Sequence, residues 1–244
     1  MSGEAKWNEA FADLAEVLVS DFDLADLLHR LADASMRVCG AAGAGIVVAD
    51  QTGRLRDIVY SSEGIRRLER IQLDTGEGPC VLCYRSGQAV QEPDIASLAE
   101  RWPRFAAAAS GLGIHSANAV PLRLRGRTVG ALNLFHPRPG VAESAALRAV
   151  QALADLAMLG IVQHSHAGAP PESVPVQVRN ALLERSQIER AKGILAEQGS
   201  LSMDEAFERL RHYALLHGAG LTQAAEALNT SPASAESVLS ATAP

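Results

Sequence analysis

The spacing of hydrophobic residues predicts helices at both ends of the first part of the chain and strands between them. Helical periodicity runs through residues 7–18, 24–38 and 143–162. Continuous apolar runs predict strands at residues 44–50, 55–61, 117–124 and 127–135. The last two strands flank Arg125-Gly126, a hairpin turn, while Asp23 and Gly40 are the candidate cap and stop of the second helix. These elements predict an α+β domain in which helices from both ends pack on one face of an antiparallel sheet.

The pattern after residue 175 is helical throughout. It predicts helices at residues 176–198, 203–217, 223–228 and 232–239. Ser202 and Glu205 form a capping box, and Thr222 and Ser231 are the candidate N-caps of the last two helices. Few large side chains are available to fill the core of this bundle. We therefore expect it to dimerise or to pack on the first domain.

A proline-bearing segment separates the two patterns. Residues 164–175 contain three prolines and no apolar periodicity, and proline does not continue a helix. We expect an α+β domain over residues 1–166, a linker over 167–175 and an all-α domain over 176–244.

Composition and charge restrict the class of protein. Of 244 residues, 48% are hydrophobic, and 22 basic against 28 acidic side chains give a net charge of −6. No apolar run reaches the roughly 20 residues of a membrane span, so we expect a soluble, cytoplasmic protein without a membrane partner. An acidic chain also lacks the overall signature of a nucleic-acid-binding protein, so any such contact must be local.

Several motifs in the first part resemble a GAF domain of the form found in actinobacterial regulators. They are Gly76-Glu-Gly-Pro-Cys80, Glu92-Pro-Asp94, Arg101-Trp-Pro-Arg-Phe105 and Gly130-Ala-Leu-Asn-Leu-Phe135. The resemblance covers roughly residues 20–163 and implies a sensor with a small-molecule pocket. Cys80, Trp102, Phe105 and His115 are the candidate lining residues, with core packing as the alternative for the aromatic pair and a surface position for His115. The sequence names neither ligand nor cofactor.

Two stretches of the second part closely resemble an ANTAR domain, a three-helix module of transcription antitermination proteins that binds paired RNA hairpin loops. They are Arg185-Ser-Gln-Ile-Glu-Arg-Ala-Lys-Gly-Ile-Leu195 and Ser202-Met-Asp-Glu-Ala-Phe-Glu-Arg-Leu-Arg211. The resemblance implies a homodimer whose RNA affinity is controlled by the sensor. The candidate RNA-binding residues are Arg185, Arg190, Lys192, Gly193 and Arg211.

The chemistry of these residues supports two readings. Arginine and lysine neutralise phosphates, Arg209 adds a further candidate, and a glycine inside a helix allows a second backbone to come close. The alternative is that the basic side chains are solvated and paired with Glu184, Glu189 and Glu197.

The third helix departs from the ANTAR pattern. The chain has no Lys or Arg after Arg211. RNA binding would then depend on Thr222, Gln223 and Asn229, or would have been lost in favour of a protein-interaction role. DNA binding is disfavoured because the last predicted helix offers only serine, alanine and glutamate to a groove.

Cys80 and Cys83 support the competing hypothesis of a thiol redox sensor with the same architecture. A CxxC pair at a helix start favours the thiolate. The related free methionine sulfoxide reductases carry further cysteines upstream, which residues 59–75 lack, and a metal site would need two more ligands. The alternative is that both cysteines are small buried hydrophobic residues. We therefore expect no catalysis and no metal site.

Overall fold

The computed structural model describes residues 3–19, 23–164, 174–231 and 235–241 of the 244-residue chain. The chain divides into a first unit, Met1–Ser20 with Leu27–Val178, and a second unit, Asp21–Asp26 with Arg179–Pro244. The linker predicted at 167–175 lies outside the described residues except for its last two, which begin helix α7 (Val174–Gly199). Pro175 is compatible with this position because the first turn of a helix makes no use of its backbone N–H.

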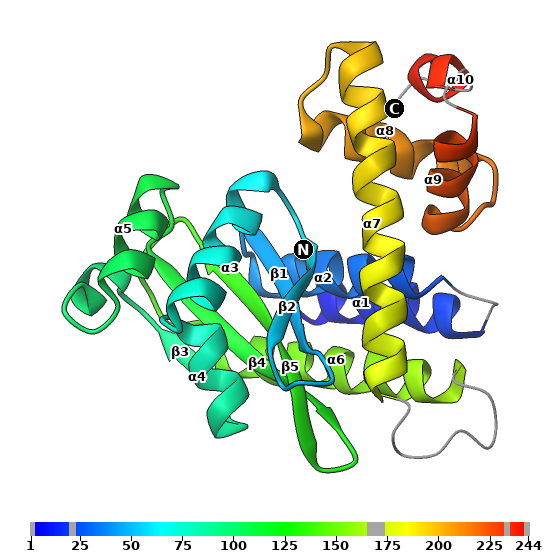
Figure 1. Ribbon diagram of the computed structural model, residues 1–244. Helices are drawn as coiled ribbons and strands as arrows, with labels where there is room; N and C mark the ends of the chain where they lie inside the picture. The colour runs from blue at the N-terminus through cyan, green and yellow to red at the C-terminus, as the bar shows by residue number, and fades with distance from the viewer. Residues whose placement is uncertain (1–2, 20–22, 165–173, 232–234, 242–244) are drawn as a thin grey trace. The chain divides into compact units, whose positions relative to one another are not determined.

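The first unit is built on a five-stranded antiparallel sheet (Figure 1). Its strands are β1 (Gly43–Ala49), β2 (Leu55–Tyr60), β3 (Val90–Glu92), β4 (Ser116–Leu124) and β5 (Arg127–His136), in the order β2-β1-β5-β4-β3. Four of these strands confirm the predictions, and β3 is additional. The predicted hairpin turn joins β4 to β5, where Arg125 and Gly126 have φ angles of 48° and 78°. Positive φ at both central residues matches the twist of the flanking strands.

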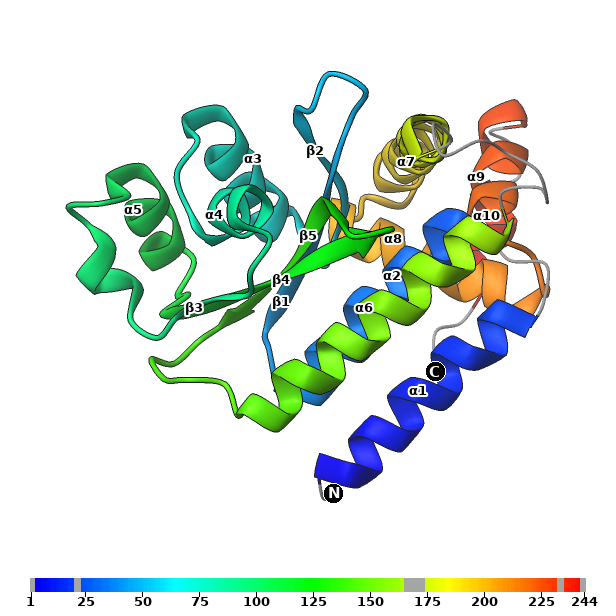
Figure 2. The same ribbon diagram turned by 90° about the horizontal axis from the view of Figure 1, so that it is seen from below.

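Three long helices lie on one side of this sheet, and the first of them packs on the outer side of the last (Figure 2). They are α1 (Gly3–Val19), α2 (Leu24–Cys39) and α6 (Ser144–His164). Helix α6 is long and apolar enough to cross a membrane by length and composition. One face of the helix, with Val150, Leu153 and Ala154, is completely buried in the unit. Packing within the domain core therefore explains the hydrophobicity of this helix.

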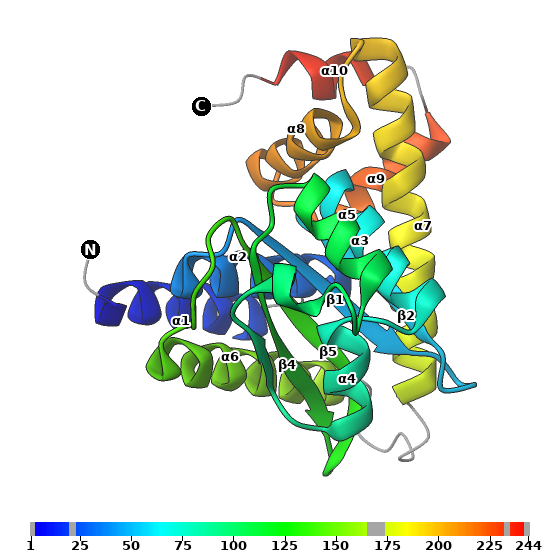
Figure 3. The same cartoon turned by 90° about the vertical axis from the view of Figure 1, so that its left-hand side faces the viewer.

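The opposite face of the sheet carries helices that the hydrophobic pattern did not predict (Figure 3). They are α3 (Glu63–Thr75), α4 (Pro79–Ser86), the 3₁₀ helix η1 (Ile95–Leu98) and α5 (Pro103–Gly111). Local signals define them: the Ser62 hydroxyl accepts the backbone N–H of Ile65, and Gly76 ends α3 with a φ of 70°. The prediction of helices on one face was therefore incomplete, because these helices are short and interrupt the periodicity.

The second unit is a bundle of α7, α8 (Met203–Leu216), α9 (Leu221–Thr230) and α10 (Ala235–Ser240). Its core contains Ile188, Leu195, Leu210, Leu221 and Leu228. The predicted capping box of Ser202 and Glu205 is confirmed at the start of α8. The predicted cap at Thr222 is wrong, since α9 begins at Leu221 after the N-cap Gly220. Ser231 is the C-cap of α9, and the residues after it, 232–234, lie outside the described part.

Asp23 accepts hydrogen bonds from backbone N–H groups at the starts of two helices, α2 and α9. Its Oδ1 accepts the backbone N–H of Ala25 at 2.9 Å and that of Asp26 at 3.2 Å, which confirms it as the cap of α2. Its Oδ2 accepts the backbone N–H of Thr222 at 2.8 Å. A glycine N-cap has no side chain to satisfy the first N–H groups of α9, so Asp23 takes this role from a distant point of the sequence.

Candidate functional site

The basic residues of α7 lie on two different faces of the helix. Arg190 is exposed, whereas Lys192 has only 2% of its surface exposed. Side chains two positions apart on an α-helix point in directions that differ by about 200° around the helix axis. Arg190 and Lys192 therefore cannot reach the same phosphate group. Arg185, seven residues before Lys192, is half-buried on the Lys192 side. The structure therefore does not bring the predicted contacts of α7 into one basic surface.

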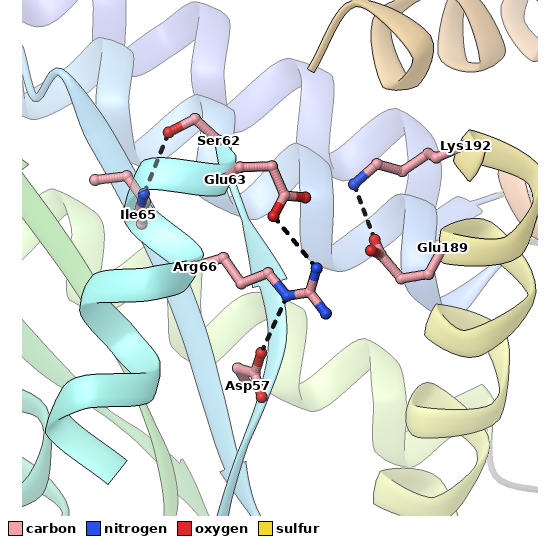
Figure 4. Close-up of polar contacts among 7 residues, drawn as sticks. All are labelled: Asp57, Ser62, Glu63, Ile65, Arg66, Glu189 and Lys192. Carbon is pink, nitrogen blue, oxygen red and sulfur yellow. Dashed lines mark hydrogen bonds and ion pairs between the residues drawn. The ribbon is translucent and has the colours of Figure 1, made fainter. Parts of the chain in front are cut away.

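Lys192 makes contacts that stabilise the bundle. Its Nζ lies 2.9 Å from Glu189 Oε1 (Figure 4). The same ammonium lies 5.6 Å from the centroid of the Phe207 ring on α8, a distance typical of a cation–π contact. Lys192, a candidate RNA contact, is therefore buried in this structure, with a carboxylate and an aromatic ring beside its ammonium group.

Gly193 lies on α7 where another backbone can approach. A Cβ atom built at this position would meet no atom within 4 Å among the described residues. The close packing that usually explains a glycine inside a helix is thus missing within the described chain. Since such a glycine costs about 1 kcal/mol relative to alanine, the open space is consistent with the approach of a partner helix or RNA.

Arg209 and Arg211 on α8 differ in their surroundings. Arg209 Nη1 donates to the carbonyl oxygens of Ala241 at 2.9 Å and Leu239 at 3.4 Å. It therefore satisfies the carbonyl groups at the end of α10, which corrects the expectation of a purely RNA-facing residue. Arg211 is half-buried.

Some polar residues of α9 form hydrogen bonds within the bundle, and others are exposed. Asn229 Nδ2 donates to the backbone oxygen of Gln187 at 2.9 Å and to its Oε1 at 2.8 Å. This side chain therefore joins α9 to α7. Gln223 is exposed, while the Thr222 hydroxyl is buried with no hydrogen-bond partner among the described residues. Of the three, Gln223 is the one presented to a ligand.

The interior of the first unit contains a buried carboxyl group, Glu69 on α3, with no exposed surface. Asn133 Nδ2 donates to its Oε1 at 2.7 Å, and Gln72 Nε2 donates to its Oε2 at 3.0 Å. Gly45, opposite Asn133 in the sheet, leaves room for this carboxyl, because a Cβ there would lie 2.3 Å from Glu69 Oε1. We call Glu69, Gln72, Asn133 and Cys80 the buried polar cluster.

Burial keeps Glu69 protonated at neutral pH. It raises the pKa of this carboxyl to about 8, against the opposing hydrogen bond from Asn133 and with a smaller contribution from the charge of Asp57. Asn133 Oδ1 has no partner among the described residues. Rotating this amide by half a turn would let Oδ1 accept the acid proton, since amide oxygen and nitrogen are assigned from the hydrogen-bond network.

Cys80 and Cys83 are both completely buried on α4. Burial raises the pKa of Cys80 well above its ordinary value, and the charges of Glu69 and Cys83 act in the same direction. Burial also raises the pKa of Cys83 to about 12. The thiolate is the reactive form of cysteine, so this surrounding does not favour the redox-sensor hypothesis.

Two of the hollows on the surface of the first unit are lined entirely by residues that the structure describes. The smaller, of about 270 Å³, lies between the β1–β2 turn, α3 and α4, and four arginines line it: Arg54, Arg56, Arg70 and Arg85. The larger, of about 590 Å³, lies beside Cys39 at the end of α2 and His136 at the end of β5. Among the residues that the structure describes, no group of three or more His, Cys, Asp or Glu side chains is placed to hold a metal ion.

Family comparisons agree with the two-unit organisation. A model described as GAF domain matches residues 23–162. The chain belongs to the GAF domain family. A model described as ANTAR domain matches residues 176–228, so an ANTAR domain of α7, α8 and α9 follows the GAF domain. Both are regulatory domains, and at the level of the family this pair fits a sensor-regulated RNA-binding antiterminator.

Similar solved structures are GAF domains from other proteins. The GAF domain of a phosphoenolpyruvate-protein phosphotransferase from Coxiella burnetii is 15% identical over 67% of this chain and 97% of its own, with a TM-score of 0.52. The free methionine-R-sulfoxide reductase of Neisseria meningitidis is 16% identical over 66% of this chain and 90% of its own, with a TM-score of 0.49. The first supports the GAF fold alone. Comparison with curated proteins gave no match.

The four candidate pocket residues of the GAF domain have different surroundings. Trp102 and Phe105 pack edge to face at 6.0 Å in a hydrophobic cluster, whereas Cys80 belongs to a different cluster. His115 is exposed. None of these four residues lines either hollow described above. In this structure Cys80, Trp102 and Phe105 are buried and His115 is exposed, which agrees with the alternatives of core packing and a surface position.

Sequence reasoning missed two features of the GAF domain. The buried polar cluster joins Glu69 to Asn133, and the arginine-lined hollow joins a turn to two helices. One signal for the first was available: Asn133 interrupts an otherwise apolar strand, and buried polar side chains require partners.

Proposed function

We propose that the chain is a signal-responsive transcription antiterminator. In this proposal the GAF domain binds a small molecule and controls a homodimeric ANTAR domain that binds paired RNA hairpins. The protein acts in the cytoplasm by stabilising an RNA structure that excludes the terminator, so it needs no covalent chemistry and is not an enzyme.

The observation that carries the RNA part of the proposal is the exposed side of α7 at Arg190 and Gly193. The exposed Arg190 offers a guanidinium group to phosphates. Gly193 lies three residues further along on the same side of the helix, and the open space there leaves room for a second backbone. Because Lys192 and Arg209 are engaged inside the bundle, each protomer offers few phosphate contacts. Dimerisation would double them.

Exposed apolar side chains support the dimer. Phe11 on α1, Leu159 on α6 and Leu183 on α7 have 46%, 54% and 55% of their surface exposed. Large exposed apolar side chains are typical of interaction surfaces. Light scattering at tens of micromolar should give twice the mass of the chain, and a monomer mass would contradict this part.

Titration with a two-hairpin RNA tests RNA binding. Arg190→Ala should weaken binding by about 1–3 kcal/mol, the range for polar contacts to nucleic acids. Arg127→Ala is the matched control, because Arg127 is an exposed arginine at the start of β5 in the GAF domain. The slope of log affinity against log salt should be only a few units. Equal affinities of wild type and Arg190→Ala would contradict the proposal.

A protein-interaction role for the ANTAR domain is the second candidate. It is favoured by Leu215 and Leu216 at the end of α8, which have 67% and 59% of their surface exposed, and by the internal bonds of Arg209 and Asn229. In this case wild type would fail to bind the RNA both with and without added metabolites, and Leu216→Gln would abolish a protein contact instead.

A further inference from the structure

The smaller hollow of the GAF domain is lined by positive charge from three separate elements. Arg54 comes from the β1–β2 turn, Arg70 from α3 and Arg85 from the last turn of α4. All three are exposed, and none has a carboxylate partner within 4.0 Å among the residues that the structure describes. Arginines that converge from different elements repel each other, so this arrangement favours a bound anion over a simply solvated surface.

The acidic residues at the hollow do not cancel this charge. Arg56, the fourth arginine of the lining, forms an ion pair with Asp50, with 2.9 Å between Arg56 Nε and Asp50 Oδ2. Asp57 is buried, and its Oδ2 lies 4.0 Å from Arg66 Nε (Figure 4). Arg66 also contacts Glu63, with 3.3 Å between Arg66 Nη1 and Glu63 Oε2. Asp74 is the remaining carboxylate of the lining. Three unpaired arginines against one unpaired aspartate leave a positive site in a chain whose net charge is −6.

Local structure fixes the positions of these arginines. Asp50 Oδ1 accepts the backbone N–H of Thr52 at 2.9 Å and that of Arg54 at 3.1 Å, which orders the turn. Gly76 ends α3 in the left-handed conformation, with a φ of 70°. Arg85 Nη2 lies close to Gly76, 3.8 Å from the position that a Cβ atom would take. The side chains therefore stand on an ordered turn and on two capped helices.

The lining also offers an apolar wall. Leu55, Leu73 and the ring of Tyr84 are half-buried there, and a volume of about 270 Å³ lies near the lower end of the range for ligand pockets. Guanidinium groups bind phosphate oxygens through two parallel hydrogen bonds. A ligand that fits must combine a compact anion with a small organic body.

We propose that this hollow binds a small phosphate-bearing molecule, with Arg54, Arg70 and Arg85 on the phosphate and Tyr84 against the organic part. Binding itself is independent of RNA. Its role as the signal of the GAF domain rests on the function proposed above.

Isothermal titration of the full chain with pyrophosphate and with adenosine monophosphate tests the proposal without RNA. Both probes should bind saturably, whereas sulfate at equal ionic strength should bind far more weakly. Arg70→Glu should weaken binding of both probes by about tenfold or more, since it replaces a charge-assisted contact by repulsion. Tyr84→Ala should weaken the nucleotide but leave pyrophosphate within about twofold, as expected of an apolar wall.

Arg67→Glu is the matched control. Arg67 lies one turn before Arg70 on α3, is exposed and does not line the hollow. Its charge reversal should leave both affinities within about twofold, because solvent screens exposed charges outside the site. The thermal unfolding midpoints of both variants should equal that of wild type, which separates lost binding from lost folding.

Three results would overturn the proposal. The first is no saturable binding of either probe up to about 5 mM, which corresponds to a binding free energy of less than about 3 kcal/mol. The second is an equal loss of affinity in Arg67→Glu and Arg70→Glu. The third is an effect of Arg70→Glu on RNA affinity alone. The last result would assign the arginines to RNA. RNA titration of the same variants distinguishes failure of this site from failure of the antiterminator proposal.

Discussion

Glu69 in the GAF domain and Lys192 in the ANTAR domain are both buried titratable side chains, but their partners differ in kind. Glu69 of the GAF domain lies among neutral groups, the amides of Gln72 and Asn133. Lys192 of the ANTAR domain lies beside a carboxylate, Glu189, and an aromatic ring, Phe207. A buried acid with neutral partners is most stable as the neutral form. A buried base with an opposite charge depends instead on that partner.

The largest effect on this comparison should come from removing the buried acid. Glu69→Ala leaves the amides of Gln72 and Asn133 without their acceptor and opens a cavity in the core. We expect the free energy of unfolding to fall by about 3–5 kcal/mol, from the cavity and the unpaired polar groups together. Denaturation by urea measures it. Glu69→Gln is the control, and an equal loss in both variants would show that the carboxyl is not neutral in the folded chain.

The pH dependence of stability tests the neutral state directly. Burial raises the pKa of Glu69 to about 8 from an ordinary value near 4.5. Between these values the folded chain holds a proton that the unfolded chain has released, so the free energy of unfolding falls as pH rises. The contribution of Glu69 to the free energy of unfolding is complete below about pH 4.5 and is lost above about pH 8. The free energy of unfolding should therefore differ by on the order of a few kcal/mol between these two pH values. Urea denaturation from pH 5 to pH 8 should show this fall in wild type and its absence in Glu69→Gln; parallel curves would contradict it.

Removing the buried base should have a smaller effect. Lys192→Ala should destabilise the chain by about 1–3 kcal/mol, since Glu189 loses its partner but keeps some access to water. Arg190→Ala, two residues earlier and exposed, should change stability by less than about 0.5 kcal/mol. Thermal or urea unfolding of both variants gives the comparison. Equal stabilities of the two variants would contradict this difference.

The smallest effect should come from the cysteines near Glu69. Cys83→Ser should lower the free energy of unfolding by about 1 kcal/mol, because the hydroxyl is buried in an apolar cluster. Labelling of native protein by a thiol reagent should modify half-buried Cys39 first and the two buried cysteines slowly. Rapid modification of Cys80 would instead bring the redox-sensor hypothesis forward.

Much of the fold follows from local patterns. The capping box at Ser202, the cap at Asp23 and the turn at Arg125-Gly126 depend on residues a few positions apart, and all three are confirmed. The long helices and four of the strands follow from hydrophobic periodicity. Helix α4 was indicated only by the helix start expected at Cys80, and α5 is too short for a long apolar stripe. Helix α3 was not predicted because its buried face includes the polar residues Glu69 and Gln72.

The candidate sites were harder to predict because side-chain surroundings depend on distant residues. Arg190 and Lys192 are two positions apart and chemically alike, yet one is exposed and the other buried. Cys80 and Phe105 belong to separate hydrophobic clusters although their motifs suggested one pocket. The geometry of packing, and not residue type, separates these cases.

By itself the sequence determined the two-part organisation, the GAF and ANTAR resemblance and the acidic charge that limits RNA contact to a local surface. These properties depend on composition, periodicity and short motifs. The tertiary structure decided which charges are buried, that Glu69 meets Asn133 across 64 positions of sequence, and that arginines from three elements line one hollow. Contacts between distant residues form only when the chain is packed, so no local pattern can specify them.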